Sequence, residues 1–366
     1  MSDEDSKAQA TTSQTGEPQG QAARRGPFRA GDRVQITDVK GRLYTTVLAH
    51  DGHFQSQRGT FHHRELIGRP DGTVLTTATG HQLLALRPLL SDYVLSMPRG
   101  AAVVYPKDAA QIVQYGDIFP GARVVEAGVG SGALSMSLLS AIGPQGRLLS
   151  VERREDFADI AKANVESWFG GEHPAWEVRT GDLADVLEAA LEQDLEPGSI
   201  DRIVLDMLAP WENLEVASRA LAPGGVLLAY VATATQLSRM AEELRATEGF
   251  TEPQAWETMV RTWHLEGLSV RPDHRMIGHT GFLITARRLA PGTTPPMRKR
   301  RPQGSKPEDD ASLAEAAPAL VHEEWTGEDI GERAVADKKV RRVRRDVRRR
   351  AEVEETGWLT PQEGDS

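Results

Sequence analysis

The feature that most constrains this chain is a glycine-rich turn between an apolar run and a helix-like run, in residues 123–135. The segment reads Arg-Val-Val-Glu-Ala-Gly-Val-Gly-Ser-Gly-Ala-Leu-Ser, with glycines at positions 128, 130 and 132. Glycines at a strand-to-helix turn let the backbone approach a ligand where any Cβ would collide. Twenty residues after Gly132, a second apolar run ends in Glu152, which is placed to bind ribose hydroxyls. The turn therefore predicts a nucleoside-containing cofactor.

The glycine turn alone fits more than one interpretation. Gly128, Gly130 and Ala133 satisfy the relaxed dinucleotide fingerprint, and nicotinamide or flavin enzymes also use an acid at the distance of Glu152. Glu126 disfavours those enzymes, because a carboxylate two residues before the first glycine repels a pyrophosphate. The same carboxylate can engage a cationic amino-acid group through water or the backbone. A turn that only packs a strand on a helix is the remaining alternative.

Two further acids favour the methyl donor S-adenosylmethionine. Asp182 follows a predicted strand at 176–179 and suits a hydrogen bond to an adenine amine, and Asp206 ends a predicted strand at 203–206. Three consecutive strands that each end in an acid line the carboxyl edge of a parallel sheet, where open α/β folds bind ligands. S-adenosylmethionine has a ribose, an adenine and a positive sulfonium but no phosphate. We therefore expect a methyltransferase rather than a hydride-transfer enzyme.

Composition excludes several chemistries. The chain of 366 residues has no cysteine, which excludes disulfides, thiolate metal sites and the cysteine nucleophile used to methylate pyrimidine C5. The spacing of the histidines matches no zinc motif, so no metal site is expected. The formal net charge of −10 argues mildly against a polyanionic partner, yet residues 338–350 hold nine basic residues and one acid. Two interpretations fit this basic segment. One is an amphipathic helix that binds an RNA backbone, an acidic partner or a surface, and the other is a solvated charged tail.

Composition also divides the chain into domains. Residues 1–27 predict a disordered tail without the apolar core of a signal peptide, and no stretch approaches the about 18 apolar residues of a membrane span. A soluble, cytoplasmic protein is therefore expected. We predict a small β-rich domain at residues 28–98, including a connector that starts near Leu83. Residues 291–366 are expected to form a linker and a charged, mostly disordered extension. The β-rich domain has alternating runs at 32–37, 43–48 and 73–77 and hairpin signals at Lys40-Gly41, Asp51-Gly52 and Asp71-Gly72.

Residues 99–290 alternate between strand-like and helix-like runs. Such alternation is typical of an α/β fold, here a Rossmann-like, parallel and doubly wound sheet. Asp108 is expected to cap a helix that starts at Ala109. The expected strands are 124–126, 147–151, 176–179, 203–206, 225–231, about 256–263 and 281–287, with helices between them.

Four motifs together resemble a known family. They are Tyr105-Pro-Lys-Asp108, Glu126-Ala-Gly-Val-Gly-Ser-Gly132, Asp206-Met-Leu-Ala-Pro-Trp211 and Gly278-His-Thr-Gly-Phe282. Over about residues 29–289 the chain is similar to the bacterial and archaeal tRNA adenine-N1 methyltransferases, which modify adenine 58 in the T-loop. The resemblance implies a class I methyltransferase fold behind a small N-terminal β domain, a homotetramer and a tRNA substrate. The basic C-terminal tail looks like the extension of actinobacterial members.

The resemblance also implies roles for individual residues. Asp206 would sit between the cofactor and the target base, and Tyr105 would stack on that base. On the cofactor side, Ser131, Gly132, Ala133 and Leu134 would hold the methionine end, Glu152 the ribose, Phe157 would pack near the adenine and Asp182 would reach its amine.

The chemistry of adenine N1 explains why few catalytic groups are needed. N1 has an in-plane lone pair, so the main task is in-line positioning at about 3–3.5 Å from the methyl donor. The base must first leave its stack, and Tyr105 or Trp211 could provide an aromatic platform, although Trp211 equally fits a core aromatic. Methylation makes the ring cationic, and Asp206 could accept from the N6 amine and stabilise that charge. The alternative role of Asp206 is a cap for the helix that starts near Trp211.

Two other functions stay open at this point. The methyl acceptor could be a protein carboxylate, as in isoaspartyl repair, or the protein could be a non-catalytic RNA-binding protein that uses the basic segment 338–350. Lys107, Arg99, Arg271 and Arg275 are candidates for phosphate contacts.

Overall fold

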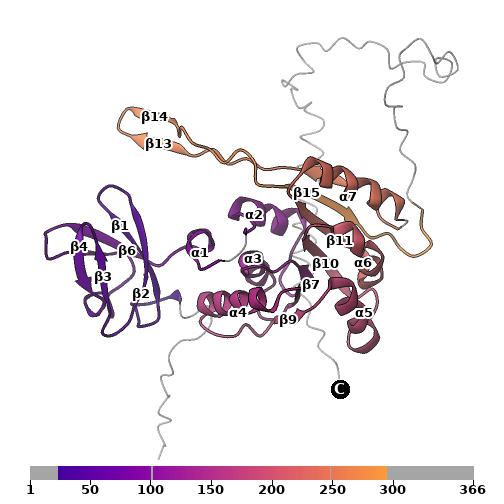
Figure 1. Cartoon of the computed structure of the whole chain (residues 1–366), viewed down its shortest axis with the longest axis horizontal. Helices are drawn as coiled ribbons and strands as arrows, with labels where there is room; N and C mark the ends of the chain where they lie inside the picture. The colour runs from indigo at the N-terminus through magenta and orange to yellow at the C-terminus, as the bar shows by residue number, and fades with distance from the viewer. Residues whose placement is uncertain (1–23, 100–101, 248, 295–366) are drawn as a thin grey trace, which may run out of the picture. The chain divides into compact units, whose positions relative to one another are not determined.

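The computed structural model describes residues 24–99, 102–247 and 249–294 (Figure 1). The described chain begins with a small β module, as predicted. Four antiparallel strands form its sheet in the order β2-β1-β6-β5, and β3 and β4 form a separate hairpin. The strands are β1 Arg33–Asp38, β2 Leu43–Val47, β3 His53–Ser56, β4 Gly59–His62, β5 Thr73–Thr76 and β6 Gln82–Leu86.

The β module has its own apolar core, because alternate residues of β1 point inward. Val34 and Ile36 are fully buried and pack with Phe28, Leu48 and Leu83. The Lys40-Gly41 turn joins the paired strands β1 and β2, as predicted. The other two turn signals do not join paired strands, since β3 pairs with β4 and β5 pairs with β6. The predicted connector begins as strand β6, because its short run continues the alternation of the sheet.

A seven-stranded sheet follows, in the order β12-β15-β11-β10-β7-β8-β9. Strands β7 to β11 are parallel, as predicted, but β15 is antiparallel to both β11 and β12. The prediction of a parallel sheet was therefore wrong for β15. The chain enters this strand at the carboxyl edge of the parallel strands, so β15 runs in the opposite direction. The strands are β7 Arg123–Ala127, β8 Arg147–Glu152, β9 Trp176–Thr180, β10 Ile200–Asp206, β11 Leu221–Val231, β12 Gln254–Trp256 and β15 Phe282–Arg287.

Helices cover both faces of this sheet, which is therefore doubly wound. Neighbouring strand residues point to opposite faces, so Val124 belongs to one buried cluster and Val125 to the other. One cluster contains residues of α1 Leu90–Ser96, α2 Pro106–Tyr115, α3 Ala133–Ile142 and α4 Glu155–Phe169. The other contains residues of α5 Leu183–Gln193, α6 Leu214–Ala220 and α7 Ala234–Ala246.

Two local predictions in this region were wrong. Helix α2 begins at Pro106 rather than at Ala109, because proline favours the first helical position, where its missing N–H is not needed. Asp108 therefore lies inside the first turn and does not cap the helix. The strand predicted at 256–263 is two short strands, β12 and β13 Trp263–Glu266, with irregular chain between them.

Strand β13 pairs with β14 Ser269–Pro272 as a two-stranded hairpin outside the main sheet (Figure 1). This hairpin, which we call the arm, carries exposed apolar side chains. The exposed fractions are 54% for Trp263, 74% for Leu265 and 104% for Leu268.

The predictions for residues 1–23 and for the tail beyond 294, including the basic segment 338–350, lie outside the described residues. Among the helices that the structure describes, none is long and apolar enough to cross a membrane.

Candidate active site

The candidate site lies at the carboxyl edge of the main sheet, between β7 and β10. Strand β7 pairs with β8 on one side and with β10 on the other, so the order of the strands reverses at β7. Ligands of open α/β sheets bind at such a reversal, outside the carboxyl ends of the strands.

The glycine turn brings the ends of β7 and β10 into contact. Gly128 has a φ of +87°, and a Cβ at this position would overlap the carbonyl oxygen of Asp206. Glycine is therefore required both by the backbone conformation and by the close approach of the two strands. The turn that the sequence predicted to bind a ligand also fixes the position of Asp206.

The last glycine of the turn starts helix α3. Gly132 is the N-cap in the left-handed conformation, and a Cβ there would meet Val165 at 3.1 Å and the Ala161 carbonyl at 3.2 Å. Ala133 and Leu134 form the buried first turn, where backbone N–H groups have no acceptor within the helix. The Ser131 hydroxyl beside them is buried without a hydrogen-bond partner. This end of the turn therefore offers donors to a ligand.

Glu126 is a fully buried carboxylate at the end of β7. Its Oε2 accepts hydrogen bonds from Ser150 Oγ at 2.6 Å and Ser135 Oγ at 2.7 Å, whereas its Oε1 is buried without a partner. Burial raises the pKa of Glu126 to about 7, although the two hydroxyls oppose the shift. A cationic group beside Oε1 would supply the missing partner.

Glu152 and Asp182 hold the backbone at the ends of β8 and β9. Glu152 Oε2 accepts from the backbone N–H of Gly130 at 2.9 Å, so this acid orders the glycine turn. Asp182 caps α5 by accepting from the backbone N–H of Ala184 at 3.1 Å, and it lies 3.2 Å from Arg153. Binding of a ribose by Glu152 and of an adenine amine by Asp182 stay predictions.

Asp206 stands at the end of β10, partly accessible to solvent. Burial, with a smaller contribution from the nearby Glu152 charge, raises the pKa of Asp206 to about 7. The N-cap of the short helix η3 Pro210–Asn213 is Ala209, so Asp206 does not cap that helix. The cap alternative for Asp206 is therefore wrong, and its side chain is left for a ligand.

A polar cluster that the sequence analysis did not find lies near Tyr105, the N-cap of α2. Lys107 Nζ donates to Asp108 Oδ1 and to Thr280 Oγ1, and Thr280 Oγ1 donates to Asp108 Oδ2, each at 2.6 Å. Asp108 is fully buried. The polar cluster of Lys107, Asp108 and Thr280 joins α2 to the segment before β15, and it occupies Lys107, which we predicted to contact phosphate.

Tyr230 of β11 is a second residue that the sequence analysis missed. Burial raises the pKa of Tyr230 to about 12. A hydrogen bond with the Thr280 side chain opposes the shift, and the nearby Asp108, Asp206 and Tyr105 add smaller increases. Position 281 requires glycine, because a Cβ there would overlap the Tyr230 ring. In the sequence, only the motif 278–282 pointed to this region, and its residue spacing could not show that Gly281 packs against Tyr230. Tyr230 therefore lies near both Asp206 and Tyr105.

The remaining candidates have other contacts. Phe157 has the Arg154 guanidinium 3.9 Å from its ring centroid. Trp211 packs against the buried cluster of α5–α7, with Arg239 4.4 Å from its ring, which favours the core interpretation. His279 lies at hydrogen-bond distance from the Ala232 carbonyl, 2.9 Å, and from Glu257, 3.2 Å.

The residues at the carboxyl edge fit S-adenosylmethionine. Beside the glycine turn, one carboxylate oxygen of Glu126 and the hydroxyl of Ser131 are both buried without hydrogen-bond partners. Carboxylates at the ends of successive strands suit a cationic nucleoside without phosphates. Fold and site together define a class I methyltransferase that uses S-adenosylmethionine.

Comparison with known proteins identifies the family. Residues 26–75 match the TrmI-like N-terminal family, and residues 82–273 match the tRNA methyltransferase complex GCD14 subunit family. The chain is 35% identical over 255 residues to the tRNA (adenine(58)-N(1))-methyltransferase TrmI of Thermus thermophilus, covering 69% of this chain and 95% of the relative. It is 32% identical over 235 residues to the tRNA (adenine(57)-N(1)/adenine(58)-N(1))-methyltransferase TrmI of Methanocaldococcus jannaschii, covering 59% and 82%. The chain belongs to the TrmI family of tRNA methyltransferases.

Solved structures agree with the fold. A SAM-dependent O-methyltransferase from Thermotoga maritima matches with a TM-score of 0.65 and 27% identity, over 72% of this chain and 95% of that chain. The tRNA (m1A58) methyltransferase TrmI from Aquifex aeolicus matches with a TM-score of 0.63 and 24% identity, over 72% of this chain and 100% of that chain.

Proposed function

We propose that this protein transfers a methyl group from S-adenosylmethionine to N1 of adenine 58 in the T-loop of tRNA. The observation that carries the proposal is the position of Asp206. Its backbone carbonyl lies against Gly128 of the glycine turn at the end of β10, and Tyr230 is close enough for the Asp206 charge to raise the pKa of its hydroxyl. The family membership supplies the substrate, because the named relatives act on adenine 58 of tRNA.

The cofactor half of the site consists of the glycine turn and the acids at the ends of β7, β8 and β9. We assign Glu126 to the positively charged methionine end, because its Oε1 is buried and unpaired. The glycine turn is proposed to face the methionine end through Gly128, Gly130, Ser131, Gly132, Ala133 and Leu134, with Glu152 on the ribose and Phe157 and Asp182 on the adenine.

The acceptor half positions the adenine. Extruding a base costs a few kcal/mol, and stacking on an aromatic ring recovers about 1–3 kcal/mol. Tyr105 is proposed as that ring, since it sits at the start of α2, where the polar cluster fixes the backbone. The hydroxyl of Tyr230 stays protonated at neutral pH, because its pKa is raised to about 12, and it can donate a hydrogen bond.

Asp206 is proposed as the catalytic residue. When bound, S-adenosylmethionine supplies an activated methyl group on a positive sulfur. An ionised Asp206 accepts a hydrogen bond from the N6 amine, orients N1 and stabilises the positive charge that develops on the ring. A cationic ligand nearby favours the ionised form and lowers the raised pKa of Asp206. N1 itself needs no base, because its lone pair carries no proton.

Methyl transfer to tRNA tests the proposal directly. The full-length protein, incubated with labelled S-adenosylmethionine and an unmodified tRNA transcript, is expected to yield 1-methyladenosine in the nucleoside digest by mass spectrometry. A transcript with guanine at position 58 is the matched control and should receive no label. Labelling that persists on the guanine transcript, or that survives ribonuclease treatment as methylated protein, would contradict the assigned acceptor.

We further propose that the protein is a homotetramer that acts in the cytoplasm, where tRNA is available. The exposed Trp263, Leu265 and Leu268 support self-association through the arm, because such exposed apolar groups usually meet a partner surface. Leu268→Arg is expected to lower the molar mass measured by light scattering after gel filtration. Val39→Arg, at an apolar position that is 68% exposed in the β module, is the control and should leave the mass unchanged.

The division of the chain into a tail at 1–27, a β-rich domain and connector at 28–98, a methyltransferase domain at 99–290 and an extension at 291–366 is also part of the proposal. It is supported by the separate apolar cores of the β module and the main sheet, although α1 of the connector packs in the core of the main sheet. Limited proteolysis with mass spectrometry tests it, since cuts are expected first outside 28–290.

A further inference from the structure

A pocket lies away from the carboxyl edge, among the described residues. Its cavity volume is about 230 Å³. Segments of the β module form one part of its wall, and α1 and the end of α4 form another. The residues that matter here are Arg24, Arg33, Arg87, Tyr93, Ser167 and Trp168.

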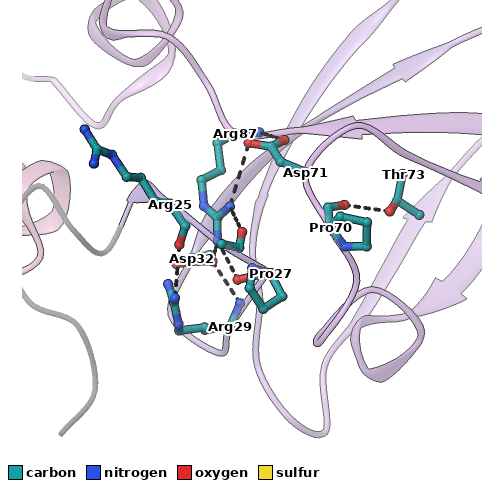
Figure 2. A network of polar contacts seen from close by, with 9 residues as sticks. Arg25, Pro27, Arg29, Asp32, Pro70, Asp71, Thr73 and Arg87 are labelled. Carbon is teal, nitrogen blue, oxygen red and sulfur yellow. Dashed lines mark hydrogen bonds and ion pairs between the residues drawn. The ribbon is translucent and has the colours of Figure 1, made fainter. Parts of the chain in front are cut away.

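Contacts within the β module hold Arg87 in place, and one of them is an ion pair with Asp32 (Figure 2). Its guanidinium lies 2.5 Å from Asp32 and donates to the carbonyls of Gly26 and Pro27, each at 2.8 Å. Its backbone N–H donates to Asp71 at 2.9 Å. Asp32, which also lines the pocket, is therefore already neutralised by Arg87.

Two other arginines are held by aromatic rings rather than by carboxylates. The Arg24 guanidinium lies 3.9 Å from the centroid of the Trp168 ring, and the Arg33 guanidinium lies 5.2 Å from that of Tyr93. Burial alone lowers the pKa of Arg24, with no acid opposing the shift. A guanidinium stacked on a ring keeps its N–H edge for an acceptor in its own plane. The pocket thus has positive charge that its own carboxylate does not compensate.

Three donors in the wall have no acceptor. Arg33 Nε, Arg87 Nε and Trp168 Nε1 are buried without a hydrogen-bond partner among the described residues. Trp168 is only 6% exposed, and the Arg87 side chain only 10%. Buried N–H groups are almost always paired, so three orphans around one cavity indicate a missing acceptor.

We propose that this pocket binds a phosphate group. The oxygens of a phosphate can accept from several N–H donors at once and match the planar fork of arginine. A carboxylate has only two oxygens and would satisfy fewer of these donors. The phosphate comes either from the backbone of the tRNA, which rests on the proposed function, or from a free nucleotide or pyrophosphate, which does not. The pocket lacks the glycine turn and terminal acids of the cofactor site, so it is a separate site.

The first test uses full-length protein and unmodified tRNA. Arg33→Gln is expected to weaken tRNA binding roughly fivefold and to reduce the slope of log Kd against log KCl concentration by about one, as the loss of one phosphate contact does. Arg64→Gln is the matched control, because Arg64 is an exposed arginine of the same module outside the pocket. Its slope should equal that of the wild type.

The second test separates the two sources of phosphate. Calorimetry with pyrophosphate as the probe is expected to show binding to the wild type and none to Arg33→Gln if the ligand is a free phosphate compound, with the tRNA slope unchanged. Trp168→Phe removes the indole N–H with the five-membered ring and keeps a smaller aromatic ring for Arg24, so it should weaken whichever ligand binds, even if Arg33→Gln fails to fold. An unchanged tRNA slope together with unchanged pyrophosphate titrations in both variants overturns the proposal. Methylation of adenine 58 is scored separately, so failure of the proposed function is distinguishable.

Discussion

The cofactor half and the acceptor half of the site are built from the chain in different ways. Glu126, Glu152 and Asp182 end three strands that follow one another along the sequence and pair side by side. The acceptor half instead joins α2 to the segment before β15, through hydrogen bonds that span 172 and 173 residues. Asp206 and Gly128 lie where the two halves meet. The cofactor half can form once its own strands have paired, whereas the acceptor half requires the whole sheet.

Substitution at the junction of the two halves should have the largest effect. Asp206→Asn is expected to lower kcat for tRNA methylation by roughly 10²–10³-fold, because the charge that stabilises the methylated ring is lost. The Kd for S-adenosylmethionine should change far less, and folding should not weaken, since the pKa of Asp206 is already raised by burial. Steady-state kinetics and calorimetry measure the two quantities. Asp201→Asn, at the opposite end of the same strand, is the control, and equal losses in both variants would remove Asp206 from catalysis.

The contact between β7 and β10 can be broken by a single methyl group. Gly128→Ala is expected to lower the free energy of unfolding by about 2–4 kcal/mol, because it combines a positive φ with overlap of the Asp206 carbonyl. Gly143→Ala is the control, with a φ of +68° and nothing within 4 Å of its Cβ. Urea unfolding measures both. The difference between the variants isolates the contact, and no difference would mean that the two strand ends are not in close contact.

The acceptor half should be separable from the cofactor half. Thr280→Val removes two hydrogen bonds of the polar cluster and leaves Asp108 with one unpaired oxygen. We expect kcat/KM for tRNA to fall roughly tenfold, the equivalent of about 1.4 kcal/mol, with an unchanged Kd for S-adenosylmethionine. Thr285→Val is the control, because Thr285 donates to the Leu227 carbonyl at 2.9 Å within the sheet. A parallel loss of cofactor affinity would show that the halves are not independent.

The smallest effect concerns pH. The pKa of Glu126 is raised from 4.5 to about 7 in the folded protein, so between these values the folded state binds a proton that the unfolded state does not. The stability of the cofactor-free protein should therefore fall as pH rises through this window, with Glu126 contributing up to about 1.4 kcal/mol per pH unit. Glu126→Gln should flatten the dependence without abolishing it, because Asp206 contributes in the same direction. Denaturant unfolding at several pH values measures it, and an unchanged slope in the variant would refute the assignment.

The same contrast explains what the sequence could predict. The glycine turn, the acids at the strand ends and the Lys40-Gly41 hairpin are local patterns, and the structure has the turn, the strands and the hairpin where they were expected. The arm was missed because the strand was expected at about 256–263, which stops at the first residue of β13, and because the side chains of β13 and β14 are largely exposed and join no core. The polar cluster and Tyr230 were missed because their partners are distant in sequence. Asp108 looked like a helix cap because its hydrogen-bond partner Thr280, 172 residues away, could not be known.

The position of β15 has a consequence for how the protein is made. In the sheet β15 lies between β11 and β12, although β12 precedes it along the chain. While the ribosome is still adding residues before Phe282, β12 has no strand to pair with and the β11 edge is open. Completion of the fold therefore waits until Arg287 has left the exit tunnel, and a nascent chain halted earlier would expose an unpaired edge to other chains.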